Sequence, residues 1–285
     1  MTPLRLLPWL SVLSLGCLAC DPAGSRIDKP EQPNDSTPQP SNEWQLVWQD
    51  EFDGPANTPP SSDKWVHDVG GGGWGNAQLE YDTNKTENVS LDGEGHLVIT
   101  ARKESFGGNS YTSGRINTRG RFAQAYGRFE ARMQLPVGRG MWPAFWLLGA
   151  NLEESPWPDC GEIDIMEYRG QLPAIIRGSL HGPGYSGGNN IGGEYVVSGG
   201  KLYEDFHVYA LEWEPERIRW QLDGVTFLET TPAKLPAGKR WVYDHPFFIL
   251  LNLAVGGNYV GPPDRSTVFP QQLKVDYVRV YTRGA

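Results

Sequence analysis

The sequence predicts an all-β sandwich of two packed antiparallel sheets, a jelly roll, on three observations. Short runs of β-branched and aromatic residues recur from Trp44 onward, with the length and alternation of strands. The 35 Gly and 23 Pro supply many turns between them. The chain shows no long amphipathic helical pattern and no internal repeat. Two curved sheets of this kind offer a concave cleft, across which a long polymer can lie.

The first 20 residues have the pattern of an export signal. Arg5 precedes an apolar run, Leu6 to Leu18, that is too short to span a membrane. Small residues precede Cys17 and Cys20, so either cysteine could carry the lipid of a bacterial lipoprotein. The alternative is an ordinary cleaved signal peptide. We expect a protein that is secreted or held at the outer cell surface, with a lipid anchor as its only membrane contact.

A tether and then a single domain follow the signal. Residues 21–42 carry five prolines among Ser, Asn, Asp and Gln, which predicts a solvated, disordered linker. Residues 43–285 form the expected domain, whose size suits one sizeable core. Turns at Asp92-Gly93 and Asp223-Gly224 are hairpin signals. The clearest predicted strands are Leu97–Ile99, Tyr126–Met133, Val208–Trp213, Ile218–Leu222, Phe247–Leu253 and Val275–Tyr281.

Composition narrows the classes of partner. A formal charge of −9 argues against binding to nucleic acid. Aromatic residues reach 12%, a content usual in proteins that bind sugars. Cys160 is the only thiol in the expected domain, so an internal disulfide is not possible there. A catalytic thiol needs a base partner, and none is evident nearby, so we interpret Cys160 as a small buried packing residue.

The most informative stretch is Cys160–Tyr168, which holds three carboxylates within six residues. Its alternation with Ile favours a strand, in which Glu162 and Asp164 share one face. Glu167 would then face the other way unless a one-residue β-bulge near Met166 turns it back. Three crowded carboxylates on one face suit acid/base and nucleophilic chemistry. The alternative is a solvated acidic strand.

Glu-Ile-Asp-Ile-Met-Glu resembles the active-site signature of glycoside hydrolase family 16, in the bulged form seen in laminarinases. The resemblance covers nearly all of residues 43–285 and includes four further segments, Gly140–Trp146, His181–Gly187, Asn252–Asn258 and Val275–Tyr281. It implies a jelly roll that hydrolyses β-1,3-glucan internally with retention of configuration. By the same resemblance Glu162 is the nucleophile, Glu167 is the acid and then the base, and Asp164 assists between them.

Three alternatives stay open at this point. Relatives that act on agar, carrageenan or mixed-linkage glucan share the bulged signature, although a sulfated galactan calls for a basic cleft and this chain is acidic. Interception of the covalent intermediate by a sugar would give transglycosylation. A non-catalytic glucan-binding protein is the rival from another class, but relatives of that type have lost the catalytic glutamates, and Glu162 and Glu167 are both present.

Candidate sugar-binding residues combine flat aromatic platforms with amide and imidazole groups. By resemblance, Trp142, Trp146 and His181 line the donor side of the cleft, and Trp157 lies just before the catalytic strand. The Gly-rich run from Gly70 lacks the Lys-Ser/Thr of a phosphate loop, so we interpret it as a loop over the cleft. We expect Asn76, and with it Glu80, to contact sugar there. For Trp213 and Trp220 we favour the core.

The resemblance also implies one structural Ca²⁺ on the convex side, away from catalysis. The matching positions are Glu51, Gly95 and Asp276, with backbone carbonyls expected from the first two. The alternative is that this site stays empty. The reaction itself is expected to need no cofactor, and the partner is a β-glucan polysaccharide bound by a monomer.

Overall fold

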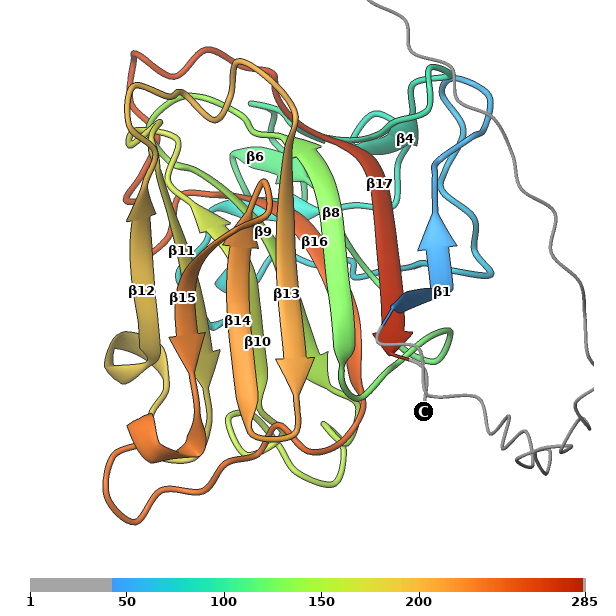
Figure 1. Ribbon diagram of the computed structural model, residues 1–285. Coiled ribbons are helices and arrows are strands. Elements are labelled where there is room, and N and C mark those ends of the chain that lie inside the picture. The colour runs from blue at the N-terminus through green and yellow to red at the C-terminus, as the bar shows by residue number, and fades with distance from the viewer. Residues whose placement is uncertain (1–42, 284–285) are drawn as a thin grey trace, which may run out of the picture. The chain divides into compact units, whose positions relative to one another are not determined.

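The computed structural model describes residues 43–283, and this part of the chain is built almost entirely of strands (Figure 1). The predicted export signal and linker, including Cys17 and Cys20, lie outside the described residues. None of the helical segments between residues 43 and 283 is long and apolar enough to cross a membrane.

Two antiparallel sheets make up the sandwich. In each of them the strands are named below in their order across the sheet, so that neighbours in the list are hydrogen-bonded to each other. The eight-stranded sheet comprises β15 (Val225–Thr230), β14 (Arg217–Leu222), β13 (His207–Glu214), β8 (Gly127–Gln134), β17 (Gln271–Arg283), β5 (Leu97–Ala101) and β4 (Val89–Leu91), with β1 (Trp44–Asp50) also paired to β17. The seven-stranded sheet comprises β12 (Ile191–Val196), β11 (Ile175–His181), β10 (Glu162–Tyr168), β9 (Met141–Gly149), β16 (Phe247–Val255), β7 (Arg115–Asn117) and β2 (Val66–His67).

Short elements complete the fold. A parallel pair joins β3 (Glu80–Asp82) to β6 (Tyr111–Ser113). Three single turns of 3₁₀ helix are η1 (Gly73–Gly75), η2 (Gly187–Asn189) and η3 (Pro232–Lys234). All six predicted strands are confirmed, in β5, β8, β13, β14, β16 and β17, except that Tyr126 precedes β8 and has a φ of 61°. Asp223 and Gly224 both have positive φ, at 48° and 79°, which is the two-residue turn expected between β14 and β15.

The core lies between the two sheets. Trp213 and Trp220 are buried in it, as predicted. The thiol of Cys160 is also buried, in a separate small apolar cluster with Leu148, Phe248 and Leu250. The indole N–H of Trp220 donates to the backbone oxygen of Asp164 at 2.8 Å. Since β14 belongs to the eight-stranded sheet and β10 to the seven-stranded one, this bond fixes the backbone under the predicted site from below.

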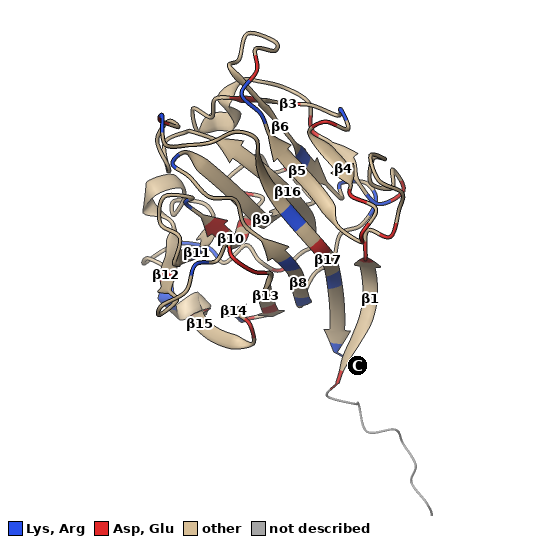
Figure 2. Ribbon diagram, turned by 90° about the horizontal axis from the view of Figure 1, so that it is seen from above, with Lys and Arg blue, Asp and Glu red and all other residues tan. Residues whose placement is uncertain are grey.

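The eight-stranded sheet carries charges of both signs, and both blue and red segments occur along β17 (Figure 2). Arg128 pairs with Glu130 at 2.8 Å and Arg132 with Asp276 at 2.6 Å. Pairing of this kind makes an ordered surface. The three predicted catalytic carboxylates lie on β10, in the seven-stranded sheet.

Candidate active site

A β-bulge interrupts β10 in the middle of the acidic segment. Against β9, Asp164 is opposite Trp146 and Met166 is opposite Phe145, which leaves Ile165 as the extra residue. The pairing with β11 shifts over the same stretch. The predicted bulge near Met166 is therefore confirmed, and it lies at Ile165–Met166.

The bulge decides which side chains face the core. Ile165 and Met166 are consecutive, yet both belong to the buried core between the sheets. Two inward side chains in succession reset the alternation, so Glu167 points to the same face as Glu162 and Asp164. The structure thus brings together all three carboxylates that the sequence singled out.

Glu162 accepts one indole hydrogen bond and lies near an imidazole. The indole N–H of Trp157 donates to its Oε2 at 2.9 Å. Nε2 of His181 lies 3.7 Å from its Oε1 and 3.0 Å from Oδ2 of Asp164. The structure therefore places Trp157 and His181, both predicted to bind sugar, in direct contact with the carboxylates themselves.

Glu167 has a separate pair of donors. The indole N–H of Trp142 donates to Oε1 at 3.2 Å, and the hydroxyl of Ser179 to Oε2 at 3.3 Å. Arg177 in turn donates to Ser179 at 3.3 Å and to Asn190 at 2.7 Å. The carboxyl of Glu167 is thus fixed from β9 on one side and β11 on the other.

Burial and mutual repulsion keep protons in this site. Loss of hydration, followed by repulsion from Asp164, raises the pKa of Glu162 to about 8 and that of Glu167 to about 7. Burial raises the pKa of Asp164 to about 7, opposed by its hydrogen bond with Glu162 and the charge of Arg177. Three such groups cannot all ionise together, so at least one proton stays on the set near neutral pH. That is the condition that a general acid requires.

An aromatic and cationic stack lies beside the carboxylates. Trp146, opposite Asp164 in the sheet, donates its indole N–H to Asn252 on β16 at 2.8 Å. The Arg115 guanidinium lies 4.8 Å from the ring of Trp146 and 4.6 Å from that of Trp74. Rings and donors of this kind suit the C–H faces and hydroxyls of a sugar chain.

The Gly-rich loop lies close to this face. Asn76 follows η1 and is exposed, and its carbonyl accepts the backbone N–H of Asn258 at 2.8 Å. A Cβ at Gly257 would come within 3.3 Å of the Trp142 ring, which places the two loops beside that indole. The expectation that Glu80 contacts sugar is wrong. Glu80 is buried, and its carboxylate accepts the backbone N–H of Val255 at 2.7 Å, which ties β3 under the loop.

Sequence reasoning missed five polar or aromatic residues of this face. Arg177 and Ser179 precede His181 by four and two residues, so the period of two used on β10 would have found them. Arg115 on β7 and Asn252 on β16 reach the site because β16 and β7 follow β9 in the sheet, and Trp74 reaches it from η1 in the Gly-rich loop. Strand order of this kind leaves no local signal in the sequence.

The predicted calcium positions lie near the junction of β1, β5 and β17. Asp50 is paired with Val278 and Leu97 with Val275, which brings Glu51, Gly95 and Asp276 toward one corner. Both carboxylate oxygens of Glu51 are taken by Arg279 at 2.8 Å. Glu51 can therefore offer only its carbonyl, as expected, and Asp276 shares its carboxylate with Arg132. The donor set is all oxygen and fits Ca²⁺.

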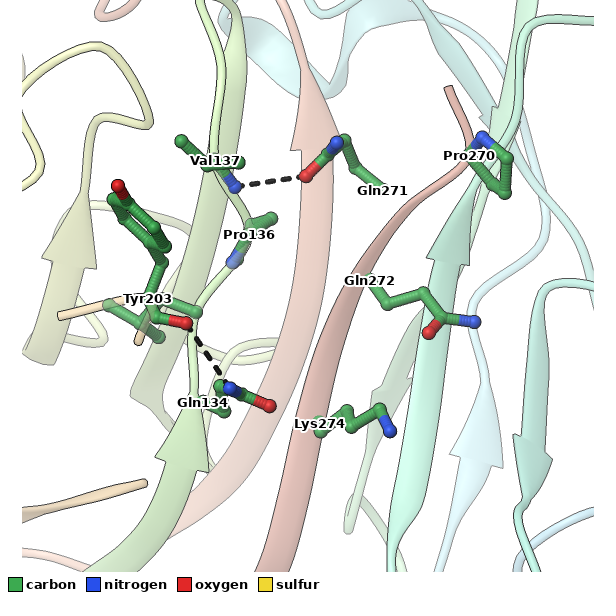
Figure 3. Close-up of a pocket in the computed structure, with 9 residues that line it drawn as sticks. Gln134, Pro136, Val137, Tyr203, Pro270, Gln271, Gln272 and Lys274 are labelled. Carbon is green, nitrogen blue, oxygen red and sulfur yellow. Dashed lines mark hydrogen bonds between the residues drawn. The ribbon is translucent and has the colours of Figure 1, made fainter. Parts of the chain in front are cut away.

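A separate hollow of about 260 Å³ opens between the end of β8 and the start of β17 (Figure 3). Two glutamine side chains that line it form hydrogen bonds within the protein. Gln134 donates to the carbonyl of Tyr203 at 3.2 Å, and Gln271 accepts the N–H of Val137 at 2.9 Å. It contains none of the predicted site residues. We therefore assign these glutamines to holding the loops of this end.

Comparison with known proteins agrees with this geometry. The model of the family "Glycosyl hydrolases family 16" matches residues 76–279. The chain is 45% identical over 248 residues to a beta-glucanase of Rhodothermus marinus, covering 84% of this chain and 85% of the relative. It is 38% identical to glucan endo-1,3-beta-glucosidase A1 of Niallia circulans, covering 83% of this chain but 37% of that longer protein. The structure of an endo-beta-1,3-glucanase from Pyrococcus furiosus superposes with a TM-score of 0.80 at 44% identity, covering 85% of this chain and 95% of the other.

Proposed function

This chain belongs to glycosyl hydrolases family 16, and we propose that it hydrolyses internal β-1,3-glucosidic bonds of laminarin-like glucans with retention of configuration. The observation that supports this proposal most directly is the bulge at Ile165, since it turns Glu167 to the face of Glu162 and Asp164. The names of the similar proteins support the β-1,3 linkage.

The reaction has two displacement steps. In the first, a carboxylate oxygen of Glu162 attacks the anomeric carbon while Glu167 gives its proton to the departing glycosidic oxygen. The C–O bond to the leaving sugar breaks and an ester bond to Glu162 forms. In the second, Glu167 takes a proton from water, which attacks the same carbon and releases Glu162. Two inversions at one carbon leave the β configuration unchanged.

The roles of the two glutamates are assigned from their places in the family signature, because burial and repulsion raise the pKa of both, that of Glu162 to about 8 and that of Glu167 to about 7, and these values alone would put the proton on Glu162. Burial raises the pKa of Glu167 to about 7, which favours the proton that the first step needs. Asp164 contributes to this by repulsion. Trp157 donates to Glu162 and stabilises its ionised form, which is the form that attacks.

Substrate binding is assigned to the aromatic residues and the loop beside the carboxylates. Trp142 and Trp146 offer ring edges and faces on β9, and Trp157 is 46% exposed, so its ring is open to a sugar. Asn76 is exposed in the loop next to Trp142 and offers an amide to a hydroxyl. The substrate of this monomer is a β-glucan polysaccharide.

Calcium has a structural role in this proposal. The Glu51 and Gly95 carbonyls and the Asp276 carboxylate would hold it, and it would stabilise the junction of β1, β5 and β17. The two displacement steps use only carboxyl groups and water, so the ion takes no part in them.

Export and tethering complete the proposal. The apolar run after Arg5 and the two cysteines at positions 17 and 20 support secretion as a lipoprotein at the outer cell surface. Replacing Cys17 or Cys20 by Ser, followed by mass spectrometry of the mature N-terminus, identifies the cysteine that carries lipid. An unmodified N-terminus cleaved beyond residue 20 would contradict the anchor and leave secretion.

The decisive experiment is reducing-end release from laminarin by the purified protein, with products resolved by length. A ladder of short oligosaccharides with the β anomer formed first, seen by NMR, is the expected result. Release from mixed-linkage glucan, agar or carrageenan in place of laminarin would overturn the linkage but not the mechanism. Binding of glucan without product from a folded sample would contradict the enzyme assignment of this chain's site.

A further inference from the structure

Two acidic residues outside the catalytic set are buried beneath the Gly-rich loop. Glu80 begins β3 and Asp82 ends it, so they lie two residues apart and point to the same face of the strand. They are 1% and 2% exposed, respectively. We call these two residues the acid pair. Neither of them takes part in the two displacement steps.

Hydrogen bonds within the protein satisfy only part of the acid pair. Oε2 of Glu80 accepts the backbone N–H of Val255 at 2.7 Å. Oε1 of Glu80 is buried without a hydrogen-bond partner in the described part of the chain, and so is Oδ1 of Asp82. A buried carboxylate oxygen without a partner is costly, and protonation lowers this cost because it removes the charge.

The charges around the acid pair can compensate one carboxylate more easily than two. The Arg115 guanidinium on β7 acts on both carboxyls, but it is already paired with Asp68 at 3.0 Å. Burial, followed by the charge of Glu80, raises the pKa of Asp82 well above its usual range. Burial raises the pKa of Glu80 to about 7. The acid pair therefore retains at least one proton near neutral pH.

The acid pair lies where the Gly-rich loop is anchored. The backbone of Asp82 exchanges two hydrogen bonds with that of Gly70, at 2.8 and 3.1 Å. The N–H of Leu79 donates to the carbonyl of Val255 at 2.8 Å. These bonds close the loop that carries Trp74, so a movement of β3 would also move that indole.

The loop is strained in this conformation. Trp74 and Ala77 both have positive φ, at 48° and 56°, a region that residues other than Gly adopt at a cost. The ring of Trp74 packs on the guanidinium of Arg115, which also contacts the ring of Trp146 beside the catalytic carboxylates. A weaker anchor at β3 would let the strain relax and would withdraw Trp74 from the active-site face.

We propose that the acid pair is a proton-dependent latch, which holds the Gly-rich loop against the active-site face and releases it when the pair loses its proton. Ionisation of both carboxyls places a second negative charge in the buried space under the loop. Hydration of that charge requires β3 to move away from β16. The stabilisation is complete below the ordinary glutamate pKa of 4.5 and is lost as the pH rises through the raised pKa of about 7.

Other ionisable groups surround the acid pair and enter its titration. Arg115 and Asp68 face it as an ion pair. Tyr111 lies on β6 and His67 on β2, where burial lowers the pKa of the imidazole. Glu104 is bonded to β6, and β16 carries no ionisable side chain. Substitutions confined to the acid pair retain all these groups and isolate its contribution.

The test measures amide hydrogen exchange of residues 70–82 in the purified protein by mass spectrometry, from pH 5 to 9. Protection factors remove the intrinsic pH dependence of chemical exchange. Protection of this segment should fall as the pH rises, by up to about 300-fold for Glu80 alone, because its pKa moves from 4.5 to about 7. The amides of β8 should keep their protection. Wild-type protection of residues 70–82 that does not change with pH would overturn the proposal.

Neutral substitutions of similar size test the acid pair directly. In Glu80→Gln the amide oxygen can still accept the N–H of Val255, and Asp82→Asn keeps the volume of the side chain. The double variant should show loop protection that is independent of pH, and each single variant a smaller dependence than the wild type. Glu216→Gln, which neutralises an exposed carboxylate between β13 and β14, is the matched control and should follow the wild type. A folded double variant with the wild-type pH course would contradict the latch.

Kinetics on laminarin give a second measurement, which rests on the proposed function. KM should rise with pH along the course of loop exchange in the wild type and stay nearly constant in the double variant. The pH profile of kcat should remain that of Glu162 and Glu167 in both proteins. The same KM profile in both would overturn the link between the latch and the cleft. Inactive wild-type protein would count against the proposed function and leave the exchange result standing.

Discussion

The two indole N–H groups at the carboxylates should act on opposite limbs of the pH–rate profile. Trp142 donates to Glu167 at 3.2 Å and Trp157 donates to Glu162 at 2.9 Å. Each bond stabilises the ionised carboxylate, so replacing either Trp by Phe should raise the pKa of its partner. Glu167 must be protonated for the first step, so Trp142→Phe should move the basic limb of kcat/KM to higher pH. Glu162 must be ionised, so Trp157→Phe should move the acidic limb to higher pH.

The geometry sets the size of each shift. A hydrogen bond to a charged group contributes about 1.5–3 kcal/mol, and 1.36 kcal/mol corresponds to one pKa unit. The Trp142 bond is at the long end of the N–H···O range, so about 1–1.4 kcal/mol, or roughly 0.7–1 unit, is expected. Trp157 is 46% exposed, and water can replace part of its bond, so its shift should be smaller, about half a unit.

The assay is initial reducing-end release from laminarin, measured well below KM across pH 4 to 10 at constant ionic strength. Each variant serves as the control for the other, because both lose one indole N–H and keep an aromatic ring. Equal displacement of both limbs in both variants, or no displacement in either, would refute the assignment of Glu162 and Glu167 to separate roles. A fall in rate without a shift would indicate lost sugar stacking.

Three further predictions concern the nucleophile, the bulge and the metal. Glu162→Ser should reduce kcat by at least about 1,000-fold and keep the melting temperature and sugar affinity close to wild type, measured by calorimetry; loss of folding would argue against a purely catalytic role. Deleting Ile165 should remove the bulge but leave Glu167 at an even spacing of four residues from Glu162, on the same face, so hydrolysis of laminarin should be retained while the loss of one buried side chain lowers the free energy of unfolding by about 1.5–3 kcal/mol; loss of activity in a variant that still folds would show that the bulge also sets the distance between the two glutamates. In a buffer whose free Ca²⁺ concentration is about 100 times the Kd, bound Ca²⁺ should add about 2.7 kcal/mol to the free energy of unfolding. Removing the ion with EDTA should therefore lower the melting temperature by roughly 5–10 °C without changing kcat at 25 °C. An unchanged melting temperature would indicate an empty site.

The parts of the site that lie on one strand were accessible from the sequence. The alternation around Glu162 and Asp164, and the odd spacing to Glu167, predicted both the strand and its bulge. Trp213 and Trp220 were assigned to the core by the same alternation. Local periodicity carries this information because the direction of a side chain depends only on its own strand.

Contacts between strands were not accessible in the same way. The Arg115 stack on Trp146 requires β7 and β9 to lie on either side of β16, although β16 begins at Phe247, far along the chain from β7 (Arg115–Asn117) and β9 (Met141–Gly149). Glu80 was misassigned because it follows the Gly-rich loop in sequence, whereas it begins β3 and its carboxylate is buried against the backbone N–H of Val255 on β16. Position along the chain does not reveal which residues another segment will cover.

The bulge also explains how a strand can hold three carboxylates and remain stable. Its extra residue disrupts the ladder, at a cost of about 0.5–1.5 kcal/mol for one lost hydrogen bond. The same residue places Ile165 and Met166 together in the core, and full burial of one such side chain contributes about 1.5–3 kcal/mol. Apolar burial therefore outweighs the broken ladder, and Trp220 anchors the backbone of Asp164 from the other sheet. The crowding of Glu162, Asp164 and Glu167 is sustained by the opposite face of the same strand.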